Sequence, residues 1–161
     1  MLEKTQAMRA LEGKRISYKA LTYPDDMRDA EEIALILDLP PAEVFKTLVV
    51  MPPEQAKKPV LVMVPADAQL DLKKLADALG VKKVKMATLR EAEQLTGLQV
   101  GGISAVALLN KPFVVLIDSS AKNIGKICIS AGKRGVQIQL AVNDVLKVTN
   151  ARMVDVASRD V

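Results

Sequence analysis

The sequence predicts an α+β fold, in which a mixed, mostly antiparallel sheet curls into a distorted β-barrel and helices pack outside it. Short apolar runs of strand length are separated by turn-like segments, and the helical patterns lie mostly in the first two thirds of the chain. From residue 103 onward nearly every run is typical of a strand, and so many successive strands can pair only by curling or closing. At 161 residues, the chain is most simply one domain spanning residues 1–161.

Helices and strands are intermixed in the first two thirds of the chain. The helix expected over 29–37 carries acidic residues in its first turn, where the helix dipole favours them. Asp71 is placed to cap the next helix, and Thr88 and Glu91 have the spacing of a capping box. The expected helices span residues 3–12, 29–37, 70–80 and 88–97, and the expected strands span 16–21, 46–51 and 59–64, the last two joined by a turn over 52–58.

The last third is predicted to be mostly strand. A short helix from Asn143 interrupts this pattern, and a final strand is expected near Met153. The other expected strands span residues 103–109, 113–118, 126–130 and 136–141.

Composition excludes several kinds of chemistry. The chain has no histidine and one cysteine, Cys128. A Ser-His-Asp or Cys-His relay, a histidine-ligated zinc, an intrachain disulfide and a multi-thiolate metal site are therefore excluded. We expect no metal and no organic cofactor. Any catalysis must come from lysine, carboxylates, tyrosine, hydroxyls, backbone amides or the substrate itself.

Positive charge is concentrated in the second half. Up to Gly80 there are 11 basic and 13 acidic residues, a balance of −2, and after it 12 basic and 6 acidic, a balance of +6. This excess fits either a face for a polyanion or a mildly basic solvated surface. With 2% aromatic residues, stacking on many exposed bases is excluded. No segment has the length and hydropathy of a signal peptide or membrane span, so we expect a soluble, cytoplasmic protein.

Three features could carry chemistry. Lys46 lies among aliphatic residues in a predicted strand, where its ammonium either reaches water or is held at the rim of an apolar pocket. Gly101 and Gly102 either form a turn or let a ligand approach backbone amides. Residues 130–135, Ser-Ala-Gly-Lys-Arg-Gly, are predicted to be a hairpin loop that is either solvated or placed against a phosphate. Tyr23 precedes a proline and two carboxylates, a pattern typical of a turn.

The order of these motifs resembles a known family. The segments ISYKALTYPDD, VFKTLVV, LDLKKLADALGVKKVKMA, TGLQVGGIS and ISAGKRGVQIQLA follow one another over approximately residues 10–160. This series is similar to the YbaK/EbsC family of free-standing Cys-tRNA(Pro) deacylases, which are related to the editing domain inserted in bacterial prolyl-tRNA synthetases. The resemblance implies a mixed α/β fold around a distorted barrel and hydrolysis of a mischarged aminoacyl-tRNA.

The resemblance also implies roles for individual residues. Lys46 would bind the 3′-terminal phosphate and ribose region, the Gly101 and Gly102 amides would hold the ester carbonyl or its oxyanion, and the thiol of a cysteinyl substrate would attack its own ester. The other residues that match family motifs are Tyr23, Thr47, Ile103, Ser104, Ser130 and Gly132, which would line the substrate pocket, and Lys133, Arg134 and Gly135, which would contact tRNA.

Two positions depart from the family pattern. Ala105 replaces the proline that follows the glycine loop, and Asp25 replaces a histidine two residues after the early tyrosine. The resemblance therefore predicts a trans-editing deacylase, most simply for Cys-tRNA(Pro), with tRNA and prolyl-tRNA synthetase as expected partners. A non-catalytic module that binds tRNA or prolyl-tRNA synthetase is the alternative, and a different ester or small-ligand pocket on the same fold is a third. The oligomeric state stays open.

Overall fold

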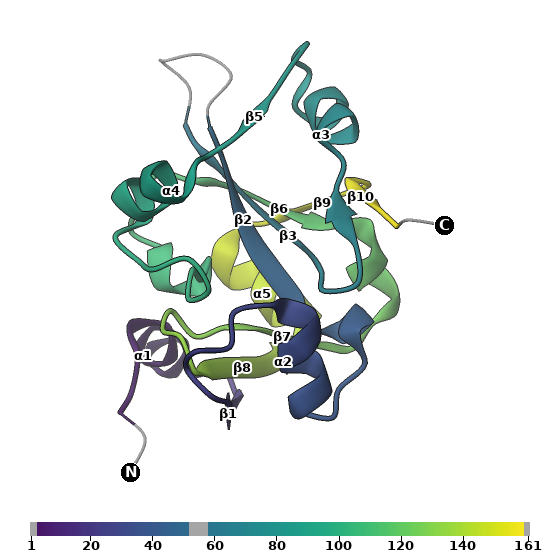
Figure 1. The fold of residues 1–161 in the computed structure, drawn as a ribbon. Coiled ribbons are helices and arrows are strands. Elements are labelled where there is room, and N and C mark those ends of the chain that lie inside the picture. Colours follow the sequence, from purple (N-terminus) through teal and green to yellow (C-terminus); the bar gives the residue numbers. More distant parts are fainter. Residues whose placement is uncertain (1–2, 52–57, 160–161) are drawn as a thin grey trace.

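The computed structural model describes residues 3–51 and 58–159, which form a mixed α+β fold (Figure 1). Its largest sheet has the strand order β5-β2-β3-β6-β9. β2 pairs antiparallel with β5 and β3, whereas β6 runs parallel to both β3 and β9. These strands are β2 (Phe45–Met51), β3 (Val60–Pro65), β5 (Lys85–Met86), β6 (Val114–Asp118) and β9 (Arg152–Val154).

Two smaller antiparallel sheets complete the strand architecture. β1 (Lys19–Thr22), β8 (Val136–Ala141) and β7 (Lys126–Ser130) form one, and β10 (Ala157–Ser158) with β4 (Gln69–Leu70) forms the other. An isolated parallel bridge between Val44 and Cys128 links the β7 sheet to the residue before β2. Across the described residues all three sheets are open, so the predicted closure into a barrel is not confirmed.

The main hydrophobic core lies between the two larger sheets. Side chains from β2 and β3, such as Phe45, Val49 and Met63, share one cluster with Ile127 and Ile138 from β7 and β8. A second cluster covers the other face of β2 and β3, where Val50 and Val62 pack with α3. Because side chains alternate along a strand, β2 contributes to both clusters.

The helices begin and end largely where the sequence predicts. Asp71 accepts hydrogen bonds from the backbone N–H groups of Lys73 and Lys74, and Thr88 and Glu91 form the expected capping box. No helix of the described residues is long and apolar enough to cross a membrane. The helices are α1 (Gln6–Gly13), α2 (Ala30–Ile36), α3 (Leu72–Leu79), α4 (Leu89–Thr96) and α5 (Val142–Thr149), with 3₁₀ turns η1 (Pro41–Glu43), η2 (Val106–Leu108) and η3 (Ser119–Asn123).

One predicted strand is wrong. Residues 103–109 form a loop and the 3₁₀ turn η2 instead of a strand, and residues 103–108 are all buried. A short run that is apolar throughout does not distinguish a buried strand from a buried helical turn. β1 starts at Lys19, three residues later than expected, and the two-residue strands β4, β5 and β10 were not expected. The turn expected over 52–58 lies outside the described residues, except for Lys58.

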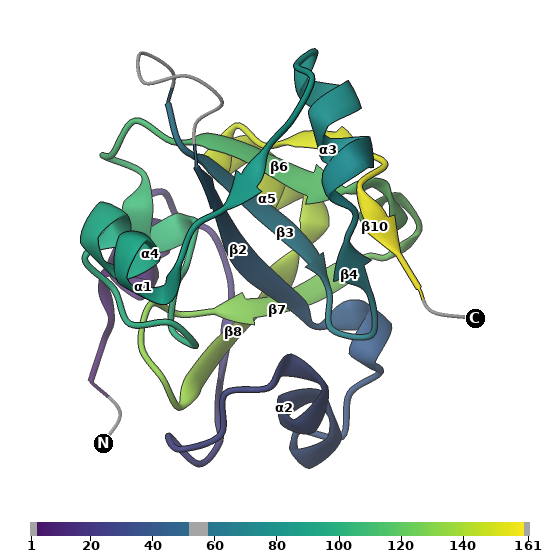
Figure 2. The ribbon, with the colours of Figure 1, turned by 45° about the horizontal axis from the view of Figure 1, so that its top comes forward.

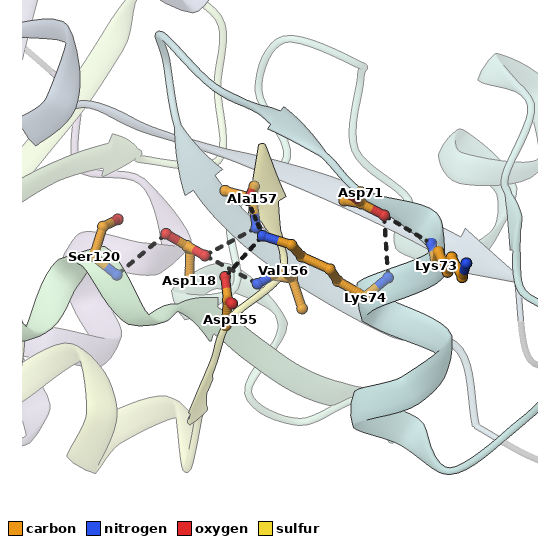
Figure 3. A network of polar contacts seen from close by, with 8 residues as sticks. All are labelled: Asp71, Lys73, Lys74, Asp118, Ser120, Asp155, Val156 and Ala157. Atoms are coloured by element: carbon orange, nitrogen blue, oxygen red, sulfur yellow. Dashed lines mark hydrogen bonds and ion pairs between the residues drawn. The ribbon is translucent and has the colours of Figure 1, made fainter. Parts of the chain in front are cut away.

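A buried carboxylate anchors the C-terminal segment to β6 (Figure 3). Asp118, 4% exposed, accepts hydrogen bonds from the backbone N–H groups of Ser120, Val156 and Ala157. Lys74 of α3 donates to the Ala157 carbonyl at 3.1 Å and pairs with Asp155 at 3.3 Å. We call this group, Asp118 with Lys74 and residues 155–157, the C-terminal clamp.

Candidate functional site

A pocket of about 190 Å³ lies at the start of β2, next to α2 and the β7–β8 sheet. Figure 2 shows α2 beside this end of β2, with β7 behind it. Pockets for drug-sized ligands measure roughly 300–1,000 Å³, so this volume suits a smaller group such as an aminoacyl moiety. Its lining residues come from five segments of the chain: Arg28, Asp29, Ala30, Ile33, Val44, Phe45, Lys46, Thr47, Leu48, Val100, Gly101, Ile103, Ser130 and Gln137.

Lys46 is a half-buried cation in the wall of this pocket. It is the second residue of β2 and lies opposite Val64 of β3, so the pairing of these two strands positions its backbone. Among the described residues Lys46 forms no ion pair. The other charged side chains of the lining are Arg28 and Asp29. Together with Lys46 they give the pocket a net positive charge. Such a site favours an anionic ligand or a developing oxyanion.

Two of the four buried side-chain atoms that lack a hydrogen-bond partner in the described part of the chain belong to residues that line the pocket, and a third is the Ser120 Oγ atom beside Asp118. The Thr47 hydroxyl and the Gln137 Oε1 atom are buried without a hydrogen-bond partner among the described residues, and both residues line the pocket. Tyr23 OH is also buried and unpartnered, one residue after β1. A buried polar atom without a partner costs about 1–3 kcal/mol. These atoms are therefore candidate hydrogen-bonding positions for a ligand or for water.

The glycine loop and the predicted hairpin are packed against each other. A Cβ on Gly102 would lie 2.9 Å from the Arg134 backbone nitrogen and 3.0 Å from the Lys133 carbonyl carbon, so only glycine fits there. The Arg134 Nε donates to the Val100 carbonyl at 2.8 Å, which ties the side chain of the hairpin to the loop. Sequence segments about 30 residues apart are thus brought to one edge of the pocket.

The early tyrosine segment lies on the same hairpin. The Tyr23 N–H donates to the Gly135 carbonyl at 3.0 Å. A Cβ on Gly135 would lie 3.2 Å from the Asp25 Cβ, and Gly135 has a φ of +93°, where glycine is favoured. Asp25, which replaces the family histidine, therefore packs on the hairpin backbone.

Five of the residues expected at the site line the pocket: Lys46, Thr47, Gly101, Ile103 and Ser130. Tyr23, Gly102 and Gly135 are buried beside them without lining it, and Lys133 is exposed. Ser104 is fully buried and accepts from the Ala107 N–H, and Gly132 packs on Ala107, so both support the loop from behind.

The two glycine amides are not equivalent. The Gly102 N–H donates to the Gln99 carbonyl at 2.8 Å, so it is already engaged within the loop, and its expected role at the ester stays a prediction. The Gly101 N–H forms no hydrogen bond with any described residue, and Gly101 lines the pocket. Of these two amides, that of Gly101 is free to hold a carbonyl oxygen.

Sequence reasoning missed Arg28, Asp29 and Gln137. Arg28 is a lone cation in an otherwise acidic stretch, which is the signal that could have singled it out. Gln137 sits opposite Ser130 in the β7–β8 register and opposite Leu21 in β1, a position that only strand pairing reveals. Ala105, which replaces the family proline, is buried outside the lining.

The single cysteine is not a nucleophile. Cys128 is 1% exposed, and burial raises the pKa of its thiol to about 11, so the reactive thiolate is disfavoured. Within residues 3–51 and 58–159, no cluster of three or more histidine, cysteine or carboxylate side chains could hold a metal ion.

Basic residues lie at both ends of β2. Lys133 is exposed in the hairpin that packs on the glycine loop, whereas Lys82, Lys83 and Lys85 are exposed near β5, which Figure 1 shows at the opposite end of β2. Lys85 pairs with Met51, five residues along β2 from Lys46, or about 16 Å at the usual rise of a strand. The expected basic face is thus divided: one group of basic residues lies near the pocket, and the other lies at the far end of β2.

Fold and pocket together define a small α+β protein with a site that favours anions. The strand that carries Lys46, the glycine loop and the Gly-Lys-Arg-Gly hairpin form this site. Residues 24–148 match the aminoacyl-tRNA editing domain, and the chain belongs to that family. A protein of Enterococcus faecalis, EbsC, described as a candidate Cys-tRNA(Pro)/Cys-tRNA(Cys) deacylase, is 36% identical over 160 residues, or 98% of this chain and 96% of its own. These matches confirm the resemblance to the YbaK/EbsC family and the expected enzyme class, aminoacyl-tRNA deacylase.

Solved structures show the same fold. The crystal structure of a hypothetical protein has a TM-score of 0.85 at 24% identity and covers 95% of this chain and 99% of its own. That of a candidate trans-editing enzyme for prolyl-tRNA synthetase has a TM-score of 0.81 at 24% identity and covers 95% of both chains. The predicted α+β class is therefore confirmed.

Proposed function

We propose that residues 1–161 act as one trans-editing domain in the cytoplasm, which removes cysteine from Cys-tRNA(Pro). The single observation that carries this proposal is the position of Lys46 and the free Gly101 amide in the same small pocket. The relative named as acting on Cys-tRNA(Pro) and Cys-tRNA(Cys) supports the choice of amino acid.

The chemistry needs no general base from the protein. The cysteinyl sulfur attacks the ester carbonyl carbon, a C–S bond forms, and the bond from that carbon to the ribose 3′ oxygen breaks. The thiol proton ends on the 3′ hydroxyl, so the products are free tRNA and a cyclic thiolactone, which water then opens. Lys46 holds the 3′-terminal phosphate and ribose, and the Gly101 N–H stabilises the oxyanion of the tetrahedral intermediate. A water nucleophile would give cysteine directly.

The pocket size supports a short aminoacyl group. The apolar part of the lining, including Ile33, Phe45 and Ile103, would contact the side chain of the amino acid. The Thr47 hydroxyl would donate to or accept from its polar atoms, and the Gln137 Oε1 atom would accept from them. The Ser130 hydroxyl accepts from the Gly132 N–H at 3.1 Å and keeps its own O–H to donate to the substrate.

Deacylation of defined substrates tests the proposal. Purified protein is incubated with labelled Cys-tRNA(Pro), Cys-tRNA(Cys) and Ala-tRNA(Pro), and ester loss is followed against buffer alone. We expect Cys-tRNA(Pro) to be cleaved fastest. Loss of every ester at the buffer rate would contradict the activity, and faster cleavage of Ala-tRNA(Pro) would contradict the amino-acid assignment.

A non-catalytic module remains the second candidate. Ala105 favours it, because the residue replaces the family proline directly after the glycine loop. Such a protein would retain tRNA or prolyl-tRNA synthetase in a pull-down and leave the ester intact. The same protein preparation can be used for both assays, so binding without cleavage would identify this function.

A further inference from the structure

We propose that Arg28 and Arg134 form an anion subsite over Gly101 at the pocket, and that it binds a backbone phosphate of the RNA strand that carries the ester. This inference rests on the proposed function, because an aminoacyl-tRNA is the ligand whose phosphates would reach this edge of the pocket. Arg28 belongs to none of the sequence motifs that indicated the site.

Both arginines pack on the same glycine. A Cβ on Gly101 would lie 3.5 Å from the Arg28 Cγ, 3.4 Å from the Arg134 Nε and 3.6 Å from the Arg134 Cγ. The two side-chain stems therefore converge on one point of the loop, although they come from segments more than 100 residues apart. Gly101 itself lines the pocket together with Arg28 and Lys46.

The guanidinium groups are available to a ligand. Arg28 is exposed, and neither arginine forms an ion pair with any described residue. The hydrogen bond from the Arg134 Nε to the Val100 carbonyl orients this side chain and leaves its terminal nitrogens without a partner in the described part of the chain. Asp29 is adjacent to Arg28 in sequence, but its carboxylate oxygens lie more than 4.0 Å from the guanidinium nitrogens of Arg28. It therefore does not neutralise Arg28.

The stems of both cations pack at Gly101, and neither guanidinium group has an ion-pair partner among the described residues, so an anion bound by both would be favoured. A guanidinium group presents paired N–H donors that match two oxygens of a phosphate. Lys46 lies deeper in the wall of the same pocket, where it would meet the terminal ribose and its phosphate. The arginine pair would then hold the strand that leads to the ester.

The test measures the deacylation kinetics of Arg28→Ala and of wild type with two substrates. One is the aminoacyl-tRNA that the wild type cleaves fastest, and the other is the matching 3′-aminoacyl adenosine, which has the ester but no phosphodiester. For tRNA we expect KM to rise about tenfold with kcat nearly unchanged. The slope of log(kcat/KM) against log[salt] should become shallower by about 1. For the adenosine ester, the variant and the wild type should have the same KM.

Two further variants serve as controls. Arg90→Ala removes an exposed arginine of α4 that lines no part of the pocket, and it should leave both KM and the salt slope unchanged. Arg28→Lys keeps the charge but not the paired donors, and should fall between wild type and Arg28→Ala. An unchanged KM and salt slope in Arg28→Ala, with active wild type, would overturn the subsite alone. A wild type that cleaves neither substrate would overturn both proposals.

Discussion

The pocket and the C-terminal clamp both bury polar groups, but they satisfy them differently. In the clamp, Asp118 accepts hydrogen bonds from three backbone N–H groups, and the Lys74 ammonium donates a hydrogen bond to the Ala157 carbonyl. In the pocket, the Thr47 hydroxyl and the Gln137 carbonyl oxygen have no partner among the described residues, and Lys46 has no counterion there. The groups that form the clamp are thus paired without a ligand, although the hydroxyl of neighbouring Ser120 is buried without a partner among the described residues, whereas these pocket groups are not paired.

This difference separates groups that stabilise the fold from groups that serve a ligand. Buried polar atoms that are satisfied internally support one conformation, and unsatisfied ones lower stability unless a ligand or water binds them. Substitutions in the clamp should therefore change stability and spare activity. Substitutions in the pocket should do the reverse.

Removal of the Lys46 ammonium should have the largest effect. Lys46→Ala should lower kcat/KM by at least about 100-fold, because Lys46 would hold the terminal phosphate and ribose, and misplacement of the ester costs rates of that order. The urea midpoint should stay near that of wild type, since Lys46 is half-buried and forms no ion pair with described residues. Single-turnover deacylation and urea denaturation measure the two effects. Retained activity would place the reaction elsewhere.

Asp118→Ala should destabilise the protein by about 3 kcal/mol, because it leaves three backbone N–H groups without an acceptor, a buried one at Val156 and partly buried ones at Ser120 and Ala157. Urea unfolding measures this, and kcat/KM per folded molecule should not change. Burial raises the pKa of Asp118, but the hydrogen bonds from Ser120, Val156 and Ala157 outweigh it and hold the pKa below its usual value.

The same carboxylate predicts a pH dependence. Because its pKa is lower in the folded protein, its stabilisation is complete above the unfolded value of about 3.9 and is lost as pH falls through the folded value. The difference in unfolding free energy between wild type and Asp118→Ala should therefore narrow below about pH 4. A constant difference down to pH 2 would contradict the assigned cause.

Gly102→Ala tests the contact between loop and hairpin. Its Cβ would meet backbone atoms of Lys133 and Arg134 at 3.0 and 2.9 Å, which cannot move as a flexible side chain would. We expect a loss of about 2 kcal/mol in stability together with lower activity, because the displaced loop carries Gly101. Gly125→Ala is the matched control, since a Cβ there has no neighbour within 4 Å. Equal behaviour of the two variants would show that the contact is not tight.

Thr47→Val should have a small effect on stability, opposite in sign to those of Asp118→Ala and Gly102→Ala. It replaces an unpartnered buried hydroxyl by a methyl group, so stability should rise by about 1 kcal/mol while kcat/KM falls. Thr96→Val is the control within the same fold: its hydroxyl donates to the Ala92 carbonyl at 2.8 Å, so its loss should destabilise. Thermal unfolding of both variants checks this; destabilisation by Thr47→Val would mean that its hydroxyl is partnered.

Local signals predicted local features well. The cap of α3 at Asp71, the capping box of Thr88 and Glu91, and the strands β2, β3, β6, β7 and β8 all lie within a residue or so of their expected places. The strand predicted over residues 103–109 was wrong because this segment is apolar and buried almost throughout. Such a segment has no hydrophobic period that would distinguish a strand from a helical turn. Closure into a barrel was inferred from the number of strands alone and is not confirmed, because the three sheets of the described residues are open.

For the site, motifs were sufficient to locate the pocket but not to assign each side chain. Lys46 and Gly101 were identified from their segments, and both line the pocket. That the Gly102 amide is engaged by Gln99 depends on one loop hydrogen bond that no spacing predicts. Arg28 is placed at the pocket by its packing against Gly101. Gln137 is placed there by the pairing of β8 with β7 and β1.

The sequence by itself determined the fold class, the family and the absence of imidazole chemistry, because composition, periodicity and motif order are properties of the chain. Tertiary structure decided which polar groups are left without partners and which cations meet at Gly101. Those properties depend on atoms from segments distant in sequence, whose distances are set by packing and strand register rather than by any local preference.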